Sequence, residues 1–119
     1  NLLHAYARAK RYREVVGTAR SMLADGPSAE AGERMGWAYF RLGDYGKSAK
    51  AYRLAIETDP SLWHAWNGLG VNSLNRWLLS DQVDVAAQSE AQDAFASSLR
   101  LNPYQPKVIA LVEKYALTQ

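Results

Sequence analysis

The sequence predicts a single all-α domain, a stack of antiparallel helix pairs closed by a C-terminal capping helix. Three observations predict it. Parts of one pattern occur three times along the 119 residues, single glycines stand inside segments with helical spacing of apolar residues, and each unit ends near a proline. β-Branched residues are few, and no segment alternates apolar with polar residues over the length of a strand, so β structure has no support.

The repeat is visible when the sequence is shifted along itself. A shift of 33 residues places Tyr6 on Tyr39, and a shift of 43 places Tyr52 on Phe95. Because a shift of 34 aligns the intervening segment, nine residues (43 − 34) are inserted between positions 75 and 88. Repetition at such a period is typical of stacked helical units, none of which buries its apolar face alone.

The elements follow from these signals and from the local stops. We expect helices at 1–9 and 12–25, at 29–42 and 45–58, at 62–79 and 83–101, and at about 105–117. The corresponding repeat units are about 1–28, 29–62 and 63–105, within one domain over 1–119. Gly43 and Asp44 form a turn, since glycine accepts the left-handed conformation at a helix C-terminus. Asp59 precedes Pro60, which disfavours helical backbone angles there. The last helix begins near Pro106 and covers the open end of the stack.

The glycines inside helices predict close packing. Gly36 and Gly70 each cost about 1 kcal/mol relative to alanine in a helix interior. That cost is offset if a facing helix approaches closely, and we expect Ala55 and Ser98 as the small facing residues. Large aromatic residues at the repeat spacing would fill the surrounding core: Tyr6, Tyr39, Tyr45, Tyr52, Trp66 and Phe95.

Composition bounds the function. The net charge is only +2 and there is no cysteine, which excludes disulfides, thiolate metal sites and cysteine nucleophiles. His4 and His64 have no ligand-type neighbour at metal spacing, and no phosphate loop or nucleophile motif occurs. We therefore expect no enzyme, catalytic residue, metal, cofactor or small-molecule substrate. No apolar run has the length of a membrane helix. The chain begins within a helical pattern, as a fragment would. The sequence does not decide between cytoplasm and periplasm, nor does it give the oligomeric state.

The repeats resemble the tetratricopeptide repeat, whose unit reads W-x2-L-G-x2-Y, then A-x3-F, then P. The middle unit has Met35-Gly36-x2-Tyr39, and the third has Trp66-x2-Leu69-Gly70. Gly32 stands where the family has tryptophan, and Ser73 where it has tyrosine. The resemblance implies a right-handed superhelical stack that acts as a non-catalytic protein-interaction module. The segment WNGLG with Val71 is also similar to bacterial repeat proteins of pilus-assembly or secretion systems.

The same resemblance implies a concave groove for a protein or peptide partner. Its predicted residues are His4, Arg8, Trp37, Phe40, Arg41, Asn67, Val71 and Asn75, with Glu30 and Glu33 beside them and Lys107 and Lys114 at the far end. Glu33 and Trp37 stand where the family's carboxylate clamp needs Lys and Asn, so a clamp is disfavoured. The residue types suit an apolar or amphipathic segment with some acidic character. The alternative is that Trp37 only packs against the next helix.

The role of the inserted segment and two alternative functions are not decided by the sequence. Trp77, Leu78 and Leu79 extend a helix past its usual end, with Ser80 and Asp81 as the expected cap of the next helix. The three apolar residues form either a lengthened hairpin or a second contact surface. Nucleic acid is a disfavoured partner, because groove residues differ between units where an RNA-reading repeat uses matched polar residues. A regulatory fragment of a larger enzyme is a further alternative.

Overall fold

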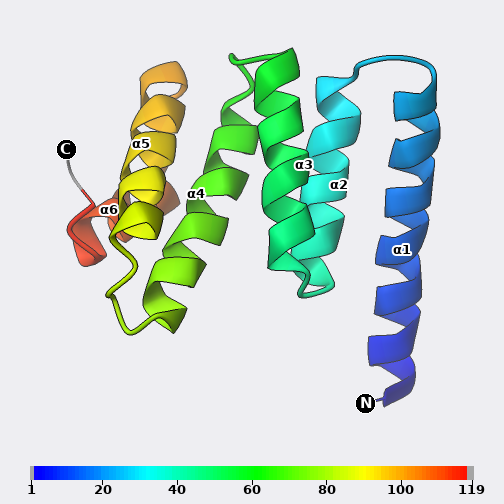
Figure 1. Ribbon diagram of the computed structural model, residues 1–119, viewed down its shortest axis with the longest axis horizontal. Coiled ribbons are helices and arrows are strands. Elements are labelled where there is room, and N and C mark those ends of the chain that lie inside the picture. Colours follow the sequence, from blue (N-terminus) through cyan, green and yellow to red (C-terminus); the bar gives the residue numbers. More distant parts are fainter. Residues whose placement is uncertain (1, 118–119) are drawn as a thin grey trace.

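A computed structural model describes residues 2–117, and this part of the chain is helical with no strand. The helices are α1 (Leu2–Ala24), α2 (Ala29–Arg41), α3 (Tyr45–Thr58), α4 (Trp63–Leu79), α5 (Val85–Leu101) and α6 (Pro106–Lys114). Consecutive helices from α1 to α5 run antiparallel and side by side, and α6 lies against α5 at the end of the stack (Figure 1). The prediction of an all-α helical-repeat stack is confirmed.

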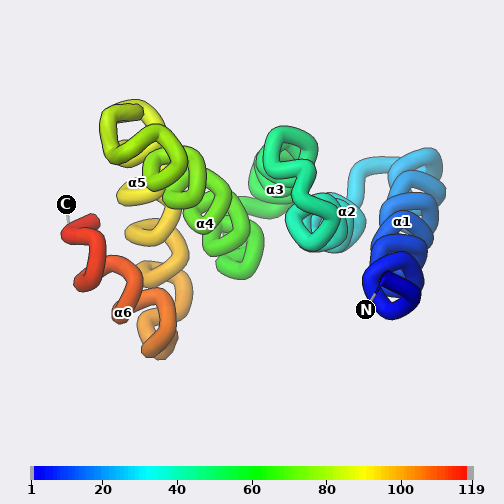
Figure 2. The backbone as a smooth tube through the Cα atoms, turned by 90° about the horizontal axis from the view of Figure 1, so that it is seen from below, coloured from blue at the N-terminus to red at the C-terminus, as the bar shows by residue number. Residues whose placement is uncertain are grey.

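The arrangement brings helices that are not consecutive together. Seen from below, the helices follow one another from α1 to α6, and α3 stands to one side of α2 and α4 (Figure 2). α2 and α4 contact each other directly as well as through α3. Because α2 and α4 are the first helices of successive units, their shared face is where a groove can form.

Side-chain caps explain where three helices begin. Ser28 Oγ accepts a hydrogen bond from the Ala31 amide at 3.1 Å at the start of α2. Asp44 caps α3 in the same way, after Gly43 has turned the chain with a φ of 81°. Asp84 caps α5 by accepting from the Ala87 amide at 3.0 Å. The predicted cap at Ser80 and Asp81 is therefore wrong, because the loop continues to Asp84.

The first unit is not a helix pair. The sequence predicted helices at 1–9 and 12–25, but α1 runs without a break from Leu2 to Ala24. The middle unit has Gly43 in the left-handed conformation where its two helices meet, whereas Lys10 and Arg11 provide no such turn. The N-terminal half of α1 consequently extends past its neighbour, and Tyr6 is 66% exposed instead of lying in the core.

The centre of the stack is the ring of Tyr52, which lies between two glycines. A Cβ added to Gly36 on α2 would lie 2.8 Å from the Tyr52 ring, and one added to Gly68 on α4 would lie 2.2 Å from it. These distances are well inside van der Waals contact, so both helices approach the two sides of the ring as only glycine permits. The Tyr52 ring, with 6% of its surface exposed, thus spaces α2 from α4.

The close approach at glycine was predicted correctly, but its partners were not. Gly36 faces the Tyr52 ring and not Ala55, which instead contacts Gly32. Gly70 likewise faces the Phe95 ring, at 2.7 Å from an added Cβ, and not Ser98. The glycines therefore make room for aromatic rings and not for small side chains.

A buried polar bridge joins the same three helices. Ser48 Oγ on α3 donates a hydrogen bond to the Gly36 carbonyl oxygen at 2.6 Å. The Asn72 side-chain amide on α4 donates to Ser48 Oγ at 2.9 Å and to the Gly68 carbonyl at 3.1 Å. Ser48 and Asn72 are both buried. The bridge thus fixes the register of α2, α3 and α4 beside the Tyr52 ring, since buried polar groups need partners.

The inserted segment is partly core. The Trp77 side chain is only 6% exposed and packs in a cluster with Phe95, Val108 and Leu117. Leu78 packs against the same cluster, whereas Leu79 is 74% exposed. The prediction of a contact surface formed by all three residues is therefore wrong for Trp77. The insertion completes the core under α6, and of the three only Leu79 is open to solvent.

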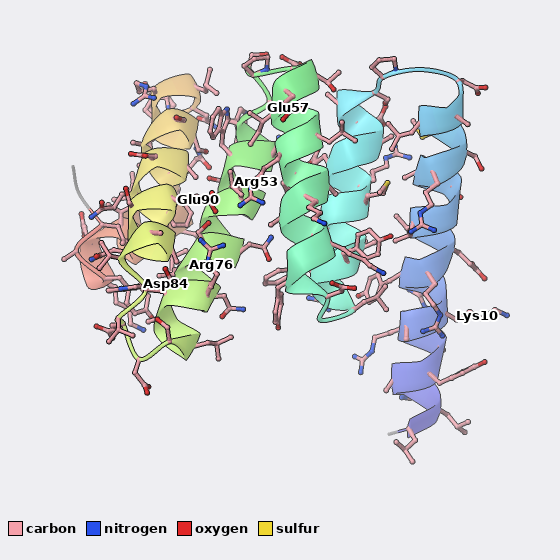
Figure 3. All side chains as sticks on the ribbon, viewed as in Figure 1. Lys10, Arg53, Glu57, Arg76, Asp84 and Glu90 are labelled. Carbon is pink, nitrogen blue, oxygen red and sulfur yellow. The ribbon has the colours of Figure 1, made fainter. Side chains whose placement is uncertain are left out.

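A charged network holds the outer face of α4 against α3 and α5. Glu90 pairs with both Arg53 and Arg76, and Arg76 also pairs with Asp84 (Figure 3). Partial burial would raise the pKa of Glu90, but hydrogen bonds from Ser73 and Arg53 and the nearby Arg53 and Arg76 charges outweigh it, so the pKa lies below its usual value. Glu90 is therefore the acceptor at the centre of the network.

We expect Gly68→Ala to destabilise the protein by about 1–3 kcal/mol, because the added methyl group overlaps the Tyr52 ring. Gly17→Ala is the matched control: Gly17 is a helical glycine of α1 with open space around it, and alanine there should stabilise by up to about 1 kcal/mol. Urea unfolding of both variants measures the difference. Equal effects at the two sites would show that the ring does not lie against Gly68.

Trp77→Ala should cost about 3–5 kcal/mol of unfolding free energy, the typical effect of removing a large buried side chain. Leu79→Ala, two residues away and exposed, should change it by no more than about 0.5 kcal/mol. Thermal and urea unfolding of the pair would test this assignment. A mild effect of Trp77→Ala would show that the Trp77 side chain is not part of the core.

Candidate interaction groove

A hollow of about 450 Å³ lies between α2 and α4 and is called the central hollow below. It is lined by Glu33, Arg34, Trp37, Phe40, Tyr52, His64, Asn67, Gly68 and Val71. The lining follows helical spacing, since residues at i, i+4 and i+7 share one face of α2 and residues at i, i+3, i+4 and i+7 share one face of α4. Tyr52 reaches the hollow from α3, past Gly68. The hollow therefore exists because the two helices stand one aromatic ring apart.

Trp37 forms much of the exposed wall. It is 47% exposed, and its ring meets Tyr12 of α1 edge to face, with ring centroids 5.1 Å apart and an interplanar angle of 83°. The Trp37 ring thus contacts the preceding helix while part of its surface stays exposed. A large side chain that keeps nearly half its surface exposed beside a hollow is available to a partner.

A second hollow of about 460 Å³ lies between α1 and α2 and includes Arg8, Tyr12, Phe40 and Arg41. Arg41 Nε donates to the Tyr12 hydroxyl at 3.1 Å, and its guanidinium carbon lies 5.6 Å from the centre of the Tyr12 ring. Phe40 lines both hollows, so the two adjoin along α2. The two hollows, lined by residues of α1, α2, α3 and α4, are together called the groove below.

The predicted groove residues are divided among separate places. Trp37, Phe40, Asn67 and Val71 meet in the central hollow, and Arg8 and Arg41 line the adjoining one. Asn75 lies elsewhere, in a hollow of about 560 Å³ between α3 and the end of α4. Three more residues line neither groove hollow: His4 on the exposed start of α1, and Lys107 and Lys114 on α6.

Four residues of the central hollow were not predicted from the sequence: Arg34, Tyr52, His64 and Gly68. His64 lies three residues before Asn67 and seven before Val71, so the periodicity of α4 could have placed it on the same face. Its ring stacks on Trp63, with centroids 3.5 Å apart. Tyr52 had no such signal, because its access to the hollow depends on Gly68, a glycine outside the repeat motif.

Comparison with known proteins supports the repeat. The sequence profile of the family described as Tetratricopeptide repeat matches residues 33–62, which span most of α2, all of α3 and the turn between them. This part of the chain is similar to a tetratricopeptide repeat. No curated protein shows significant similarity to the chain. Tetratricopeptide repeats generally serve protein–protein interaction, and the family is generally non-catalytic.

Two further properties concern the described part of this repeat protein. Across residues 2–117, no helix combines the length and apolar character needed to cross a membrane. Over the same residues, no three His, Asp or Glu side chains come together as a set of metal ligands.

Tyr52 has the most altered acidity at the groove. Burial, and then the negative charge of Glu33, raise the pKa of its phenol to about 12 from an ordinary value of 10.0. The neutral phenol is favoured in the folded state because neither the buried site nor the nearby carboxylate accommodates a phenolate. The repeat protein thus presents an uncharged ring edge to the central hollow at physiological pH.

The raised pKa predicts a loss of stability at high pH. Between pH 10 and 12 the unfolded state releases the Tyr52 proton while the folded state keeps it, so the unfolding free energy falls by up to about 1.4 kcal/mol per pH unit. Tyr52→Phe keeps the ring between the glycines but has no phenol proton to release. The unfolding free energy of this variant should therefore fall less steeply over that range. Guanidinium unfolding of both proteins from pH 8 to 12 measures the difference. Parallel curves would contradict the assignment.

Proposed function

We propose that this repeat protein binds a segment of a partner protein in the groove formed by the two adjoining hollows, as one component of a multiprotein assembly. The observation that carries the proposal is the half-exposed Trp37 ring beside the aromatic-lined central hollow. Tryptophan and arginine are the residue types most enriched in binding hot spots, and Arg41 lies one helical turn from Trp37 on α2. The groove accommodates side chains of a segment lying across α1, α2 and α4.

The kind of assembly is a separate part of the proposal. The similarity of residues 66–71 to bacterial repeat proteins of pilus-assembly or secretion systems supports a role in such a complex. Non-catalytic scaffolding also agrees with a groove whose walls are aromatic and amide side chains. The net charge of +2 gives little electrostatic support for RNA as the partner.

The proposal is tested by selecting peptides that bind the protein from a random display library and measuring their affinity for variants. Trp37→Ala combined with Arg41→Glu should weaken these peptides by about tenfold or more. The helical circular dichroism should be largely preserved, because both side chains are exposed. Tyr104→Ala removes another exposed aromatic residue, 88% exposed and outside the lining of both groove hollows, and should leave affinity unchanged.

Each alternative has its own result. Unchanged affinity in the folded double variant would place the binding site elsewhere. Loss of helicity would mean that Trp37 is a structural residue. Binding of single-stranded RNA that weakens steeply with salt would favour the RNA-binding alternative. A catalytic domain in a longer form of the protein would make the repeats its regulatory part.

A further inference from the structure

The central hollow contains a carboxylate that has no ion-pair partner. Within residues 2–117, the Glu33 side chain makes neither a hydrogen bond nor an ion pair. Arg34, the nearest basic neighbour along the chain, also lines the hollow but is held by Glu30 at 2.6 Å. Glu33 is half-buried, and its charge reaches the buried Tyr52 phenol. A partly buried carboxylate without a counter-ion is a feature that a bound cation would satisfy.

A second acceptor beside the hollow also lacks a donor. The Asn67 amide nitrogen donates to Gln105 Oε1 at 2.5 Å. This orientation is fixed, because the Gln105 amide nitrogen itself donates to oxygens of Ser98 and Asn102. The Asn67 side-chain oxygen is consequently buried without a hydrogen-bond donor among the described residues. The Glu33 carboxylate on α2 and the Asn67 oxygen on α4 are both hydrogen-bond acceptors without a donor among the described residues.

The remaining lining of the hollow suits the methylene stem and the flat charged group of a basic side chain. Trp37, Phe40 and Tyr52 surround the hollow with aromatic surface. Aromatic faces attract cations, and the methylene stem of a long basic side chain packs well on apolar surface. An acidic side chain would instead be repelled by Glu33, and an apolar one would bury that carboxylate without a partner.

We propose that the central hollow binds an arginine side chain of the partner segment, with the guanidinium at Glu33 and the stem against Trp37. Arginine fits better than lysine, because a planar guanidinium stacks on aromatic rings and pairs with a carboxylate through two parallel hydrogen bonds. The inference rests on the proposed function and specifies its chemistry. It replaces the acidic character expected from residue types alone, since that expectation did not place Glu33 inside the hollow.

The test uses small probes that report on the hollow itself. N-acetyl-arginine methylamide is titrated into the isotope-labelled protein, and the Trp37 indole and Gly68 amide signals are followed by NMR. The citrulline analogue is nearly the same size and neutral. We expect saturable shifts with the arginine compound, at least about fivefold tighter than with citrulline, the discrimination of a charge-assisted hydrogen bond. Millimolar affinity is expected for so small a ligand.

Two variants separate Glu33 from a carboxylate outside the hollow. Glu33→Gln should reduce arginine binding to the citrulline level, whereas Glu57→Gln, which removes an exposed carboxylate of α3 outside the hollow lining, should preserve it. Equal binding of arginine and citrulline, or tighter binding of the N-acetyl-glutamate analogue, would overturn the inference. So would arginine binding that survives Glu33→Gln.

Failure of this inference is distinguishable from failure of the proposed function. Library peptides that lose affinity on Trp37→Ala but contain no basic residue would keep the groove and overturn the arginine site. Library peptides that are indifferent to Trp37→Ala would overturn the groove, whatever they contain. Enrichment of arginine in peptides that lose affinity in both Trp37→Ala and Glu33→Gln would support both.

Discussion

The arrangement of α2, α3 and α4 depends on one side chain, the ring of Tyr52, held between Gly36 and Gly68. The ring is thick enough to keep α2 and α4 apart and thin enough, against two glycines, to let both touch it. The bridge from Gly36 through Ser48 to Asn72 keeps the three helices in register. Because the groove residues project from α2 and α4, this packing also sets the width of the central hollow. Core and binding surface therefore share one constraint.

Much of this organisation could be predicted from the sequence. The aligned tyrosines, glycines and prolines located α2, α3, α4 and α5 within a few residues, because local signals such as Gly43 and Pro60 determine where helices end. Helical periodicity also put Trp37 and Phe40 on the open face of α2. The repeat motif carries this information because each unit must present the same packing surface to the next.

Other features depend on contacts that a linear pattern does not contain. The sequence did not show that α1 continues without a turn at Lys10. It also did not show that Trp77 packs with residues of α5 and α6. Gly68 was overlooked because it lies outside the repeat motif, yet it admits the Tyr52 ring to the hollow. Glu33 was expected beside the groove, whereas it lies in the lining of the central hollow. An aromatic spacer and an unneutralised carboxylate thus meet at one place, where the partner is proposed to bind.

The most direct measurement of the central claim is the set of nuclear Overhauser effects from the Tyr52 ring protons in the folded protein. We predict strong effects to the α protons of both Gly36 and Gly68, with those protons shifted upfield by the ring current. Effects to only one of the two glycines would mean that the ring does not separate α2 from α4. The central hollow would then need another physical origin.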